Sequence, residues 1–232
     1  SRFVIGIDLG TTNSCVSFVD FDEEKNPGLS IRHFSILQAT SNGVVEAKPP
    51  LPSFCYLSDG MQISKGSFDL PWAKGRDFVT GVYAREHGGK IPSRLIQSAK
   101  SWLCNQSASR KERILPCSAG DGVTRLSPVE ATAYYLKHIK DAWNHLMAKG
   151  SFDCEFEQQE IVLTVPASFD EVARSLTVEA AKLAGFVNMT LLEEPQAAFY
   201  HWIATQNNHS HKILKPGDQV VVCDVGGGTC DF

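Results

Sequence analysis

The feature that most constrains this chain is a strand-and-loop pattern that occurs twice. Residues 4–12 read VIGIDLGTT, and residues 220–229 read VVVCDVGGGT. In each copy an apolar run, which predicts a buried strand, leads into an aspartate, one apolar residue and a run of glycine and threonine. The two aspartates, Asp8 and Asp224, lie 224 − 8 = 216 positions apart. A repeat of this kind indicates two related halves that face each other across a cleft.

Loops of this composition are suited to binding phosphate. Glycine lets the backbone adopt positive φ and approach a ligand closely, so that successive N–H groups can converge on phosphate oxygens. Threonine hydroxyls add donors, and an aspartate can hold Mg²⁺, which then bridges to the phosphates. A single Asp-x-Gly turn is usually only a hairpin, but two copies after buried strands predict a clamp on the β- and γ-phosphates. The chain contains no GxxxxGK[ST] and no GxGxxG opening a helix, so a P-loop and a dinucleotide fold are not supported.

The rest of the sequence predicts an α/β domain with a mixed sheet. Capping residues mark the helices most clearly: Ser127, Pro128 and Glu130 form a capping box, and Gly150 and Gly185 end two helices. The stretch 38–122 is rich in proline and glycine and predicts an inserted subdomain with one helix. Strands are expected at 3–7, 14–21, 29–37, 160–165, 189–192 and 219–224, and helices at 92–103, 127–149, 168–185 and 195–205.

Composition narrows the class of protein. The chain has 232 residues, 43% of them hydrophobic, and a net charge of −4, which argues against a sequence-independent grip on nucleic acid. No apolar run is long enough to span a bilayer, so we expect neither nucleic acid nor membrane as a partner. The seven cysteines form no CxxC pair, and we expect Cys15 and Cys223 to be buried as small hydrophobes in a reduced, cytoplasmic protein.

The two loops resemble those of DnaK-type chaperones, the seventy-kilodalton heat-shock proteins, within the actin-like ATPase superfamily. The similarity lies in GIDLGTTNSCV at 6–16 and DVGGGTCD at 224–231, and also in VPASF at 165–169 and EPQAA at 194–198. It implies an actin-like (ribonuclease H-like) fold: a mixed five-stranded sheet with flanking helices and an inserted α/β subdomain. The implied division is subdomain IA at 1–37 and 115–194, subdomain IB at 38–114, and a connecting helix with the first strands of a truncated lobe II at 195–232.

The resemblance also assigns the site. It implies binding of ATP or ADP with Mg²⁺ organised by Asp8 and Asp224 through water, with K⁺ as a further candidate ion. Lys100 is similar to the family lysine that positions the attacking water, and Glu194 and Asp231 to the remaining carboxylates of the site. The phosphate contacts would come from Gly10, Thr11, Thr12, Asn13, Gly226, Gly227, Gly228 and Thr229.

Two further residues resemble a relay. Pro166 and Arg174 match a proline switch and its arginine contact, which in the family pass the nucleotide state to a substrate domain. The implied activity is ATP hydrolysis coupled to binding of unfolded client polypeptides in a domain absent from these residues. A J-domain co-chaperone and a nucleotide-exchange factor are the implied partners. We expect residues 1–232 alone to be an inactive N-terminal fragment that binds ATP weakly.

The sequence departs from the family pattern at several positions. The segment Leu51-Pro52-Ser53-Phe54 lacks the threonine that is usual there, and Ser101-Trp102-Leu103-Cys104 replaces the usual Arg-Leu-Ile-Gly. Gln196 replaces a threonine, and Cys230 replaces a phenylalanine. Three other functions therefore stay open: a small-molecule kinase of the same fold, an actin-like filament protein, and a regulator that binds nucleotide without turnover. Phosphoryl acceptors, nucleotide-dependent polymerisation and a lack of turnover, respectively, would identify them.

Overall fold

A mixed sheet of six strands forms the centre of the molecule in a computed structural model, which describes residues 1–22, 30–58, 64–206, 213–228 and 230–231. The strand order is β11-β10-β1-β2-β3, and β6 pairs with β2. Strands β1, β10 and β11 run parallel, whereas β2 is antiparallel to β1. Their bounds are β1 Phe3–Leu9, β2 Asn13–Asp20, β3 Arg32–His33, β6 Pro50–Pro52, β10 Glu160–Val165 and β11 Met189–Glu193.

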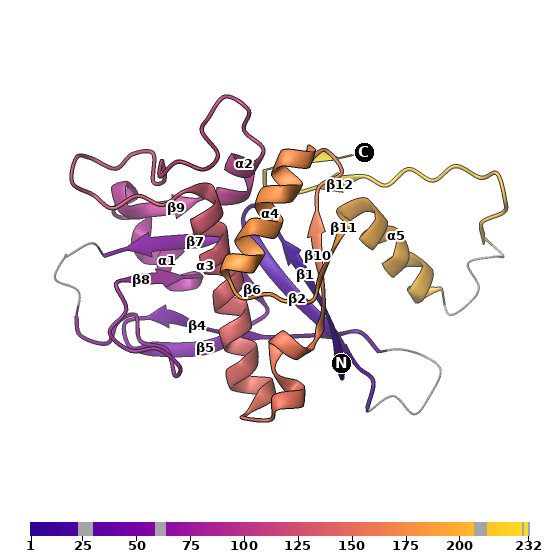
Figure 1. Ribbon diagram of the computed structural model, residues 1–232, viewed down its shortest axis with the longest axis horizontal. Helices are drawn as coiled ribbons and strands as arrows, with labels where there is room; N and C mark the ends of the chain where they lie inside the picture. The colour runs from indigo at the N-terminus through magenta and orange to yellow at the C-terminus, as the bar shows by residue number, and fades with distance from the viewer. Residues whose placement is uncertain (23–29, 59–63, 207–212, 229, 232) are drawn as a thin grey trace.

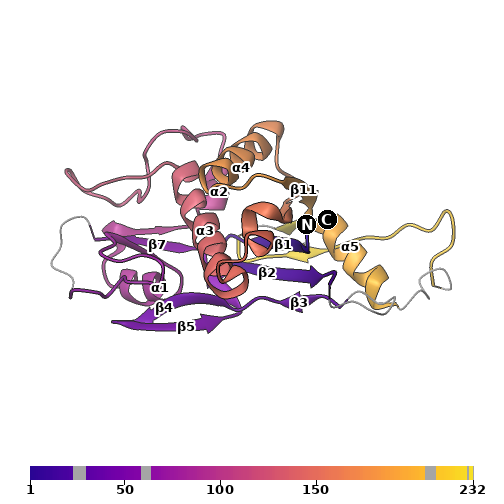
Figure 2. The ribbon, with the colours of Figure 1, turned by 60° about the horizontal axis from the view of Figure 1, so that its bottom comes forward.

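Alternation along β1 separates a buried face from an open one. Phe3, Ile5 and Ile7 are almost fully buried against helices α3 (Pro128–Trp143) and α4 (Glu171–Leu183), whereas Asp8 is exposed. Trp143 is at the centre of this core, with its ring centroid 5.2 Å from that of Phe3. In Figures 1 and 2, α3 and α4 lie together beside the sheet, and α5 (Glu194–Thr205) lies apart from both. The face opposite α3 and α4 is the one that the site uses.

The predicted capping signals set the helix ends. The Ser127 side chain accepts a hydrogen bond from the backbone N–H of Glu130, and the Glu130 carboxylate accepts one from the N–H of Ser127. Helix α3 continues through one wider turn, Asn144–Ala148, and ends before Gly150, as expected. Helix α4 begins later than expected, because Asp170 caps it by accepting from the N–H of Ala173.

The inserted segment contains more structure than the sequence indicated. Its single predicted helix at 92–103 was wrong: this stretch is a 3₁₀ turn (Pro92–Arg94), strand β9 (Leu95–Gln97) and the short helix α2 (Ala99–Leu103). Ser98, at φ 56°, separates the last two, because a left-handed residue interrupts a helix. The other elements of this segment are β4 Ile36–Ser41, β5 Val44–Lys48, β7 Phe54–Leu57, β8 Phe78–Thr80 and α1 Val82–Gly88.

Two other predicted strands differ in the structure. The expected strand at 29–37 contributes only β3 to the central sheet, and the chain then enters β4, which pairs with β5 in a separate sheet. The expected buried strand at 219–224 is exposed, and only β12 (Asp224–Val225) is paired, with β13 (Cys230–Asp231). Among the described residues nothing pairs with 219–223, so an apolar run alone was not sufficient to produce a strand.

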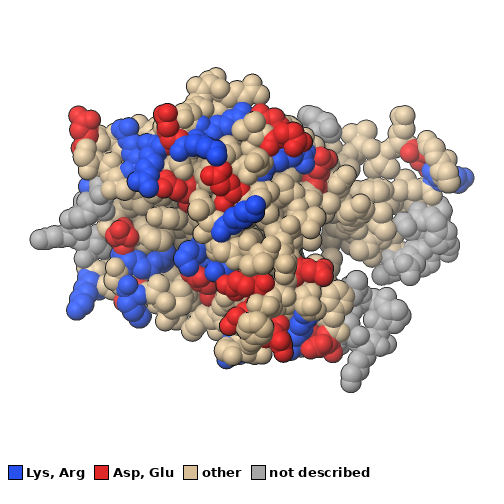
Figure 3. All heavy atoms as spheres, in the orientation of Figure 1, with Lys and Arg blue, Asp and Glu red and all other residues tan. Residues whose placement is uncertain are grey.

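Two expectations about cysteines and sheet size were also wrong. Cys15 and Cys223 are both exposed, because Cys15 lies on the open side of β2 and Cys223 precedes β12 outside any strand. The central sheet has six strands rather than five, since β6 adds to β2. In the part of the chain that the structure describes, no helix has the length and apolar character required to cross a bilayer. Acidic and basic side chains are intermixed over most of the face seen in Figure 3.

His138 joins α3 to the inserted segment. Its Nε2 donates to the carbonyl oxygen of Leu37 at 2.9 Å, so its Nδ1, 2.7 Å from Thr80 Oγ1, accepts from that hydroxyl. The ring is only 3% exposed. Burial lowers the pKa of His138 to about 4, and the charge of Arg76 acts in the same direction, whereas the bond to Leu37 opposes it. The ring is therefore neutral in the folded protein at pH 7.

This histidine predicts a loss of stability in mild acid. Between pH 6.5 and 4 the unfolded chain binds a proton at His138 that the folded chain does not, so stability falls as the pH is lowered through this window. We expect the free energy of unfolding in urea to drop by about 2 kcal/mol between pH 7 and pH 5 on account of this residue. His138→Gln should remove that part of the drop, and His145→Gln, an exposed histidine next to α3, should retain it. Equal slopes for the two variants would contradict this assignment.

Candidate functional site

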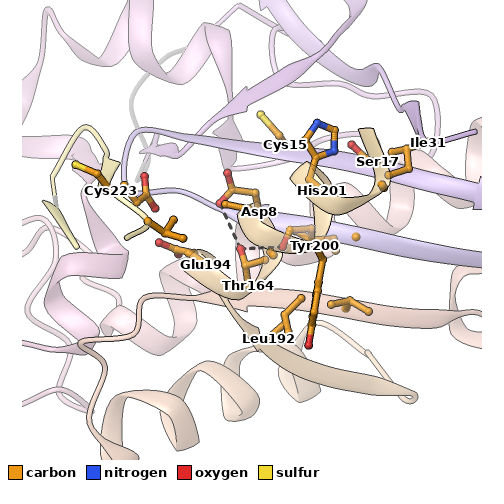
Figure 4. Close-up of a pocket in the computed structure, with 18 residues that line it drawn as sticks. Asp8, Cys15, Ser17, Ile31, Thr164, Leu192, Glu194, Tyr200, His201 and Cys223 are labelled. Carbon is orange, nitrogen blue, oxygen red and sulfur yellow. Dashed lines mark hydrogen bonds between the residues drawn. The ribbon is translucent and has the colours of Figure 1, made fainter. Parts of the chain in front are cut away.

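A cavity of about 740 Å³ lies between the open face of the sheet and α5. Its walls come from strands far apart in sequence, β1, β2, β10 and β11, and from the residues before β12. Figure 4 shows Asp8, Thr164 and Glu194 near one another, with Leu192, Tyr200 and Ile31 farther along the cavity. Charged groups therefore gather at one part of an otherwise largely apolar hollow.

The two repeated aspartates line this same cavity. Asp8 lies near the carboxyl end of β1, and Asp224 begins β12. Thr164 of the parallel strand β10 donates to Asp8 Oδ1 at 3.4 Å. Asp8 and Asp224, which are 216 positions apart in sequence, therefore lie at one site.

The two glycine–threonine loops lie against each other. A Cβ atom at Gly227 would lie 2.6 Å from Thr12 Cγ2, and one at Gly228 would lie 2.7 Å from Thr11 Cγ2, so only glycine permits this approach. The position of Gly10 is restricted by its own loop, since a Cβ atom there would overlap the backbone oxygen of Asn13. The two loops are therefore tight, and they pack against each other through Thr11 and Thr12 of the first and Gly227 and Gly228 of the second.

Lys100 and Glu194 form a buried ion pair beside the loops. Lys100 Nζ lies 2.5 Å from Glu194 Oε1, and the two side chains are only 6% and 11% exposed. Burial raises the pKa of Glu194, and the charges of Asp8 and Asp224 act in the same direction, whereas Lys100 opposes them. Lys100 also lies 6.0 Å from the ring centroid of Phe169. A buried cation is thus paired with a carboxylate at the edge of an acidic site.

The donor set fits a hard divalent cation. Carboxylate oxygens from Asp8, Asp224 and Glu194 line one cavity, and oxygen ligands are those that Mg²⁺ prefers. Burial raises the pKa of Glu194 most, and the nearby charges of Asp8 and Asp224 add to this effect. Within the described residues, no three metal-binding side chains lie close enough together to hold a metal ion. The protein alone would therefore not complete the coordination of Mg²⁺, and its remaining ligands would be water or phosphate.

Pro166 and Arg174 are linked through a third residue. The N–H of Phe169 donates to the oxygen of Pro166 at 3.2 Å, and Arg174 Nε donates to the oxygen of Phe169 at 3.1 Å. Arg174 also pairs with Glu193 at 2.7 Å. Glu193, which pairs with Arg174, and Glu194, which pairs with Lys100, are neighbours in the chain.

The remaining predicted site residues are placed as follows. Asn13 begins β2, Gly226 follows β12, and Asp231 lies opposite Asp224 in the β12–β13 register, while Thr229 lies outside the described residues. Sequence reasoning missed four residues that contact the site: Thr164, Phe169, Glu193 and Ser53. The first three lie within or beside quoted motifs, but Ser53 reaches Gly10 across 43 positions, and no local pattern indicates such a contact.

Comparison with known proteins agrees with this geometry. A family model described as Hsp70 protein matches residues 83–232, well over half of the chain. The chain is 28% identical over 239 residues to the chaperone protein HscA of Enterobacter sp. (strain 638), and 28% identical over 250 residues to a chaperone protein HscA homolog of Tolumonas auensis. Each alignment covers 100% of this chain and 32% of the relative, so the chain spans about a third of the length of these curated relatives.

Proposed function

The chain belongs to the Hsp70 family, and from this premise we propose that it forms the phosphate-binding part of an ATP-dependent molecular chaperone that hydrolyses ATP to ADP and phosphate. The actin-like ATPase fold follows from family membership and is consistent with the mixed sheet and its helices. One observation carries the proposal furthest. The buried Lys100–Glu194 pair lies at the cavity that also receives Asp8 and Asp224 from the two repeated loops.

Charge and position together supply the proposed catalysis. Phosphoryl transfer gains most of its rate from fixed charges that match the charge developing on the phosphate oxygens. Lys100 is buried and held in place by Glu194, so its ammonium group needs little reorganisation when negative charge develops nearby. The glycine loops would donate N–H groups to the phosphates from both sides. A bound Mg²⁺, held by Asp8 and Asp224 through water, would neutralise phosphate charge.

The finer parts of the proposal concern partners and organisation. We assign residues 1–37 and 115–194 to subdomain IA, 38–114 to subdomain IB, and 195–232 to the connection into a second lobe. Unfolded polypeptides are the proposed clients, with a J-domain co-chaperone and a nucleotide-exchange factor as regulators. A reduced, cytoplasmic setting is part of the proposal.

The proposal is tested by phosphate release from ATP without any added acceptor. The full natural chain should release phosphate from ATP with Mg²⁺ at a slow, saturable rate, and EDTA should abolish the release. Hydrolysis to ADP without an acceptor would separate an ATPase from a sugar kinase of the same fold, which requires its acceptor for efficient turnover. Turnover that appears only when an acceptor is supplied would overturn the proposal.

A further inference from the structure

Ser53 lies buried directly against the first glycine–threonine loop, in the connection between β6 and β7. Its side chain is 2% exposed. Ser53 Oγ donates to the backbone oxygen of Gly10 at 2.8 Å, and Ser53 N donates to the backbone oxygen of Thr12 at 2.9 Å. Ser53 therefore binds two carbonyl groups of the same loop, one through its side chain and one through its backbone.

Ser14 completes the arrangement. Its Oγ lies 3.0 Å from Ser53 Oγ. A serine hydroxyl has one proton, and that of Ser53 is used by Gly10, so the Ser14 hydroxyl donates to Ser53. The hydroxyls form a directed chain, Ser14 to Ser53 to Gly10, in a site that excludes water. An interruption would leave a buried polar group without a partner.

This chain sets the direction of the loop's N–H groups. In a trans peptide the carbonyl of one residue and the N–H of the next point in opposite directions. Because the carbonyls of Gly10 and Thr12 are directed at Ser53, the N–H groups of Thr11 and Asn13 point away from it. These two N–H groups belong to the loop that the proposed function places on phosphate.

Ser53 is itself held by the inserted segment. The buried Gln38 amide donates from Nε2 to the oxygen of Pro50 at 2.9 Å, and its Oε1 accepts from the N–H of Val82 at 3.0 Å. Residues 50–52 form β6, which pairs with β2 directly after the loop. The loop thus rests on a segment that is anchored to β4 and α1 through one side chain.

We propose that Ser53 is a positioning residue for nucleotide binding, which fixes the backbone of the first loop so that its N–H groups are ready to receive phosphate. This inference rests on the proposed function and deepens it. A residue with only a structural role would change the stability of the fold without changing the affinity for ADP. A positioning role predicts a loss of affinity that follows the hydroxyl group rather than the volume of the side chain.

The test compares three substitutions by titration of ADP and Mg²⁺ into the full natural chain. Ser53→Ala and Ser53→Cys should raise the Kd for ADP by about fivefold to tenfold, since each loses a hydrogen bond and a thiol is a weak donor. Ser53→Thr retains the hydroxyl and should bind ADP within about twofold of the natural protein. Ser67→Ala is the matched control, because Ser67 is also a serine with 2% exposure but bonds to Asn42 and Ser64 away from the loop. It should leave the Kd for ADP unchanged.

The outcomes separate this inference from the proposed function. If the natural protein fails to bind ADP, both fall. If it binds and the cysteine variant binds equally well, only the role of Ser53 is overturned. If the alanine variant does not fold, the comparison between cysteine and threonine, which differ in the donor group, still decides the question. A cysteine variant with lower affinity and the same melting temperature as the threonine variant would support the inference.

Discussion

Replacing Lys100 with alanine is expected to lower the rate of ATP hydrolysis by about a hundredfold to a thousandfold, the cost typical of removing one preorganised electrostatic group. The reason is the position of its ammonium group, 2.5 Å from Glu194 and beside the cavity that contains Asp8 and Asp224. Single-turnover hydrolysis in the full natural chain measures this effect without a contribution from product release. The rate constant should fall much more than the affinity for ATP.

Stability has to be separated from chemistry in this experiment. Lys100 is buried, so its removal leaves Glu194 as an uncompensated carboxylate, which costs about 3–5 kcal/mol in typical buried pairs. The double variant Lys100→Met/Glu194→Gln removes both charges and should recover much of the stability while staying inactive. Lys137→Ala, which also breaks a lysine–carboxylate pair but on the exposed surface of α3, should retain full activity. Activity in the double variant would exclude a catalytic role for Lys100.

The second large effect is expected at Gly10. A Cβ atom there would overlap the backbone oxygen of Asn13, so Gly10→Ala must open the turn between β1 and β2. Misplacement of a catalytic loop by about 1 Å can cost about a hundredfold in rate, and we expect a loss of that size in kcat/KM for ATP. Steady-state phosphate release across a range of ATP concentrations measures it.

Gly120→Ala is the matched control for Gly10→Ala. A Cβ atom at Gly120 meets no atom within 4 Å, so the same change of residue type has no steric consequence. Its kcat/KM should equal that of the natural protein. If Gly10→Ala also retained natural kcat/KM, the first loop would not hold phosphate in the way we propose.

Local chemistry made much of the fold predictable. The capping box at Ser127 and the strands expected at 3–7, 14–21 and 160–165 each depend on neighbours in sequence, and each element is present with nearly the expected bounds. The actin-like fold, expected from the loops, is confirmed by the family match. The two aspartates of the repeat, Asp8 and Asp224, line one cavity, and the phosphate clamp expected from the repeat stays a prediction.

The failures share a physical cause, which is dependence on distant partners. The apolar run at 219–223 has the composition of a buried strand, but a strand requires a neighbour to pair with, and composition does not supply one. The helix expected at 92–103 was divided because β9 pairs with β7, a contact across the inserted segment. The contact of Ser53 with Gly10 was not predicted for the same reason, since the two residues are 43 positions apart.

ATP turnover by the full natural chain, with and without an unfolded peptide, tests the central claim most directly. A chaperone couples hydrolysis to peptide binding through closure of its cleft, so peptide should accelerate phosphate release severalfold, and Lys100→Ala should abolish both the basal and the accelerated rates. Phosphate release that is insensitive to peptide, or that persists at the natural rate in Lys100→Ala, would contradict the account of this chain as the phosphate-binding part of an ATP-dependent chaperone.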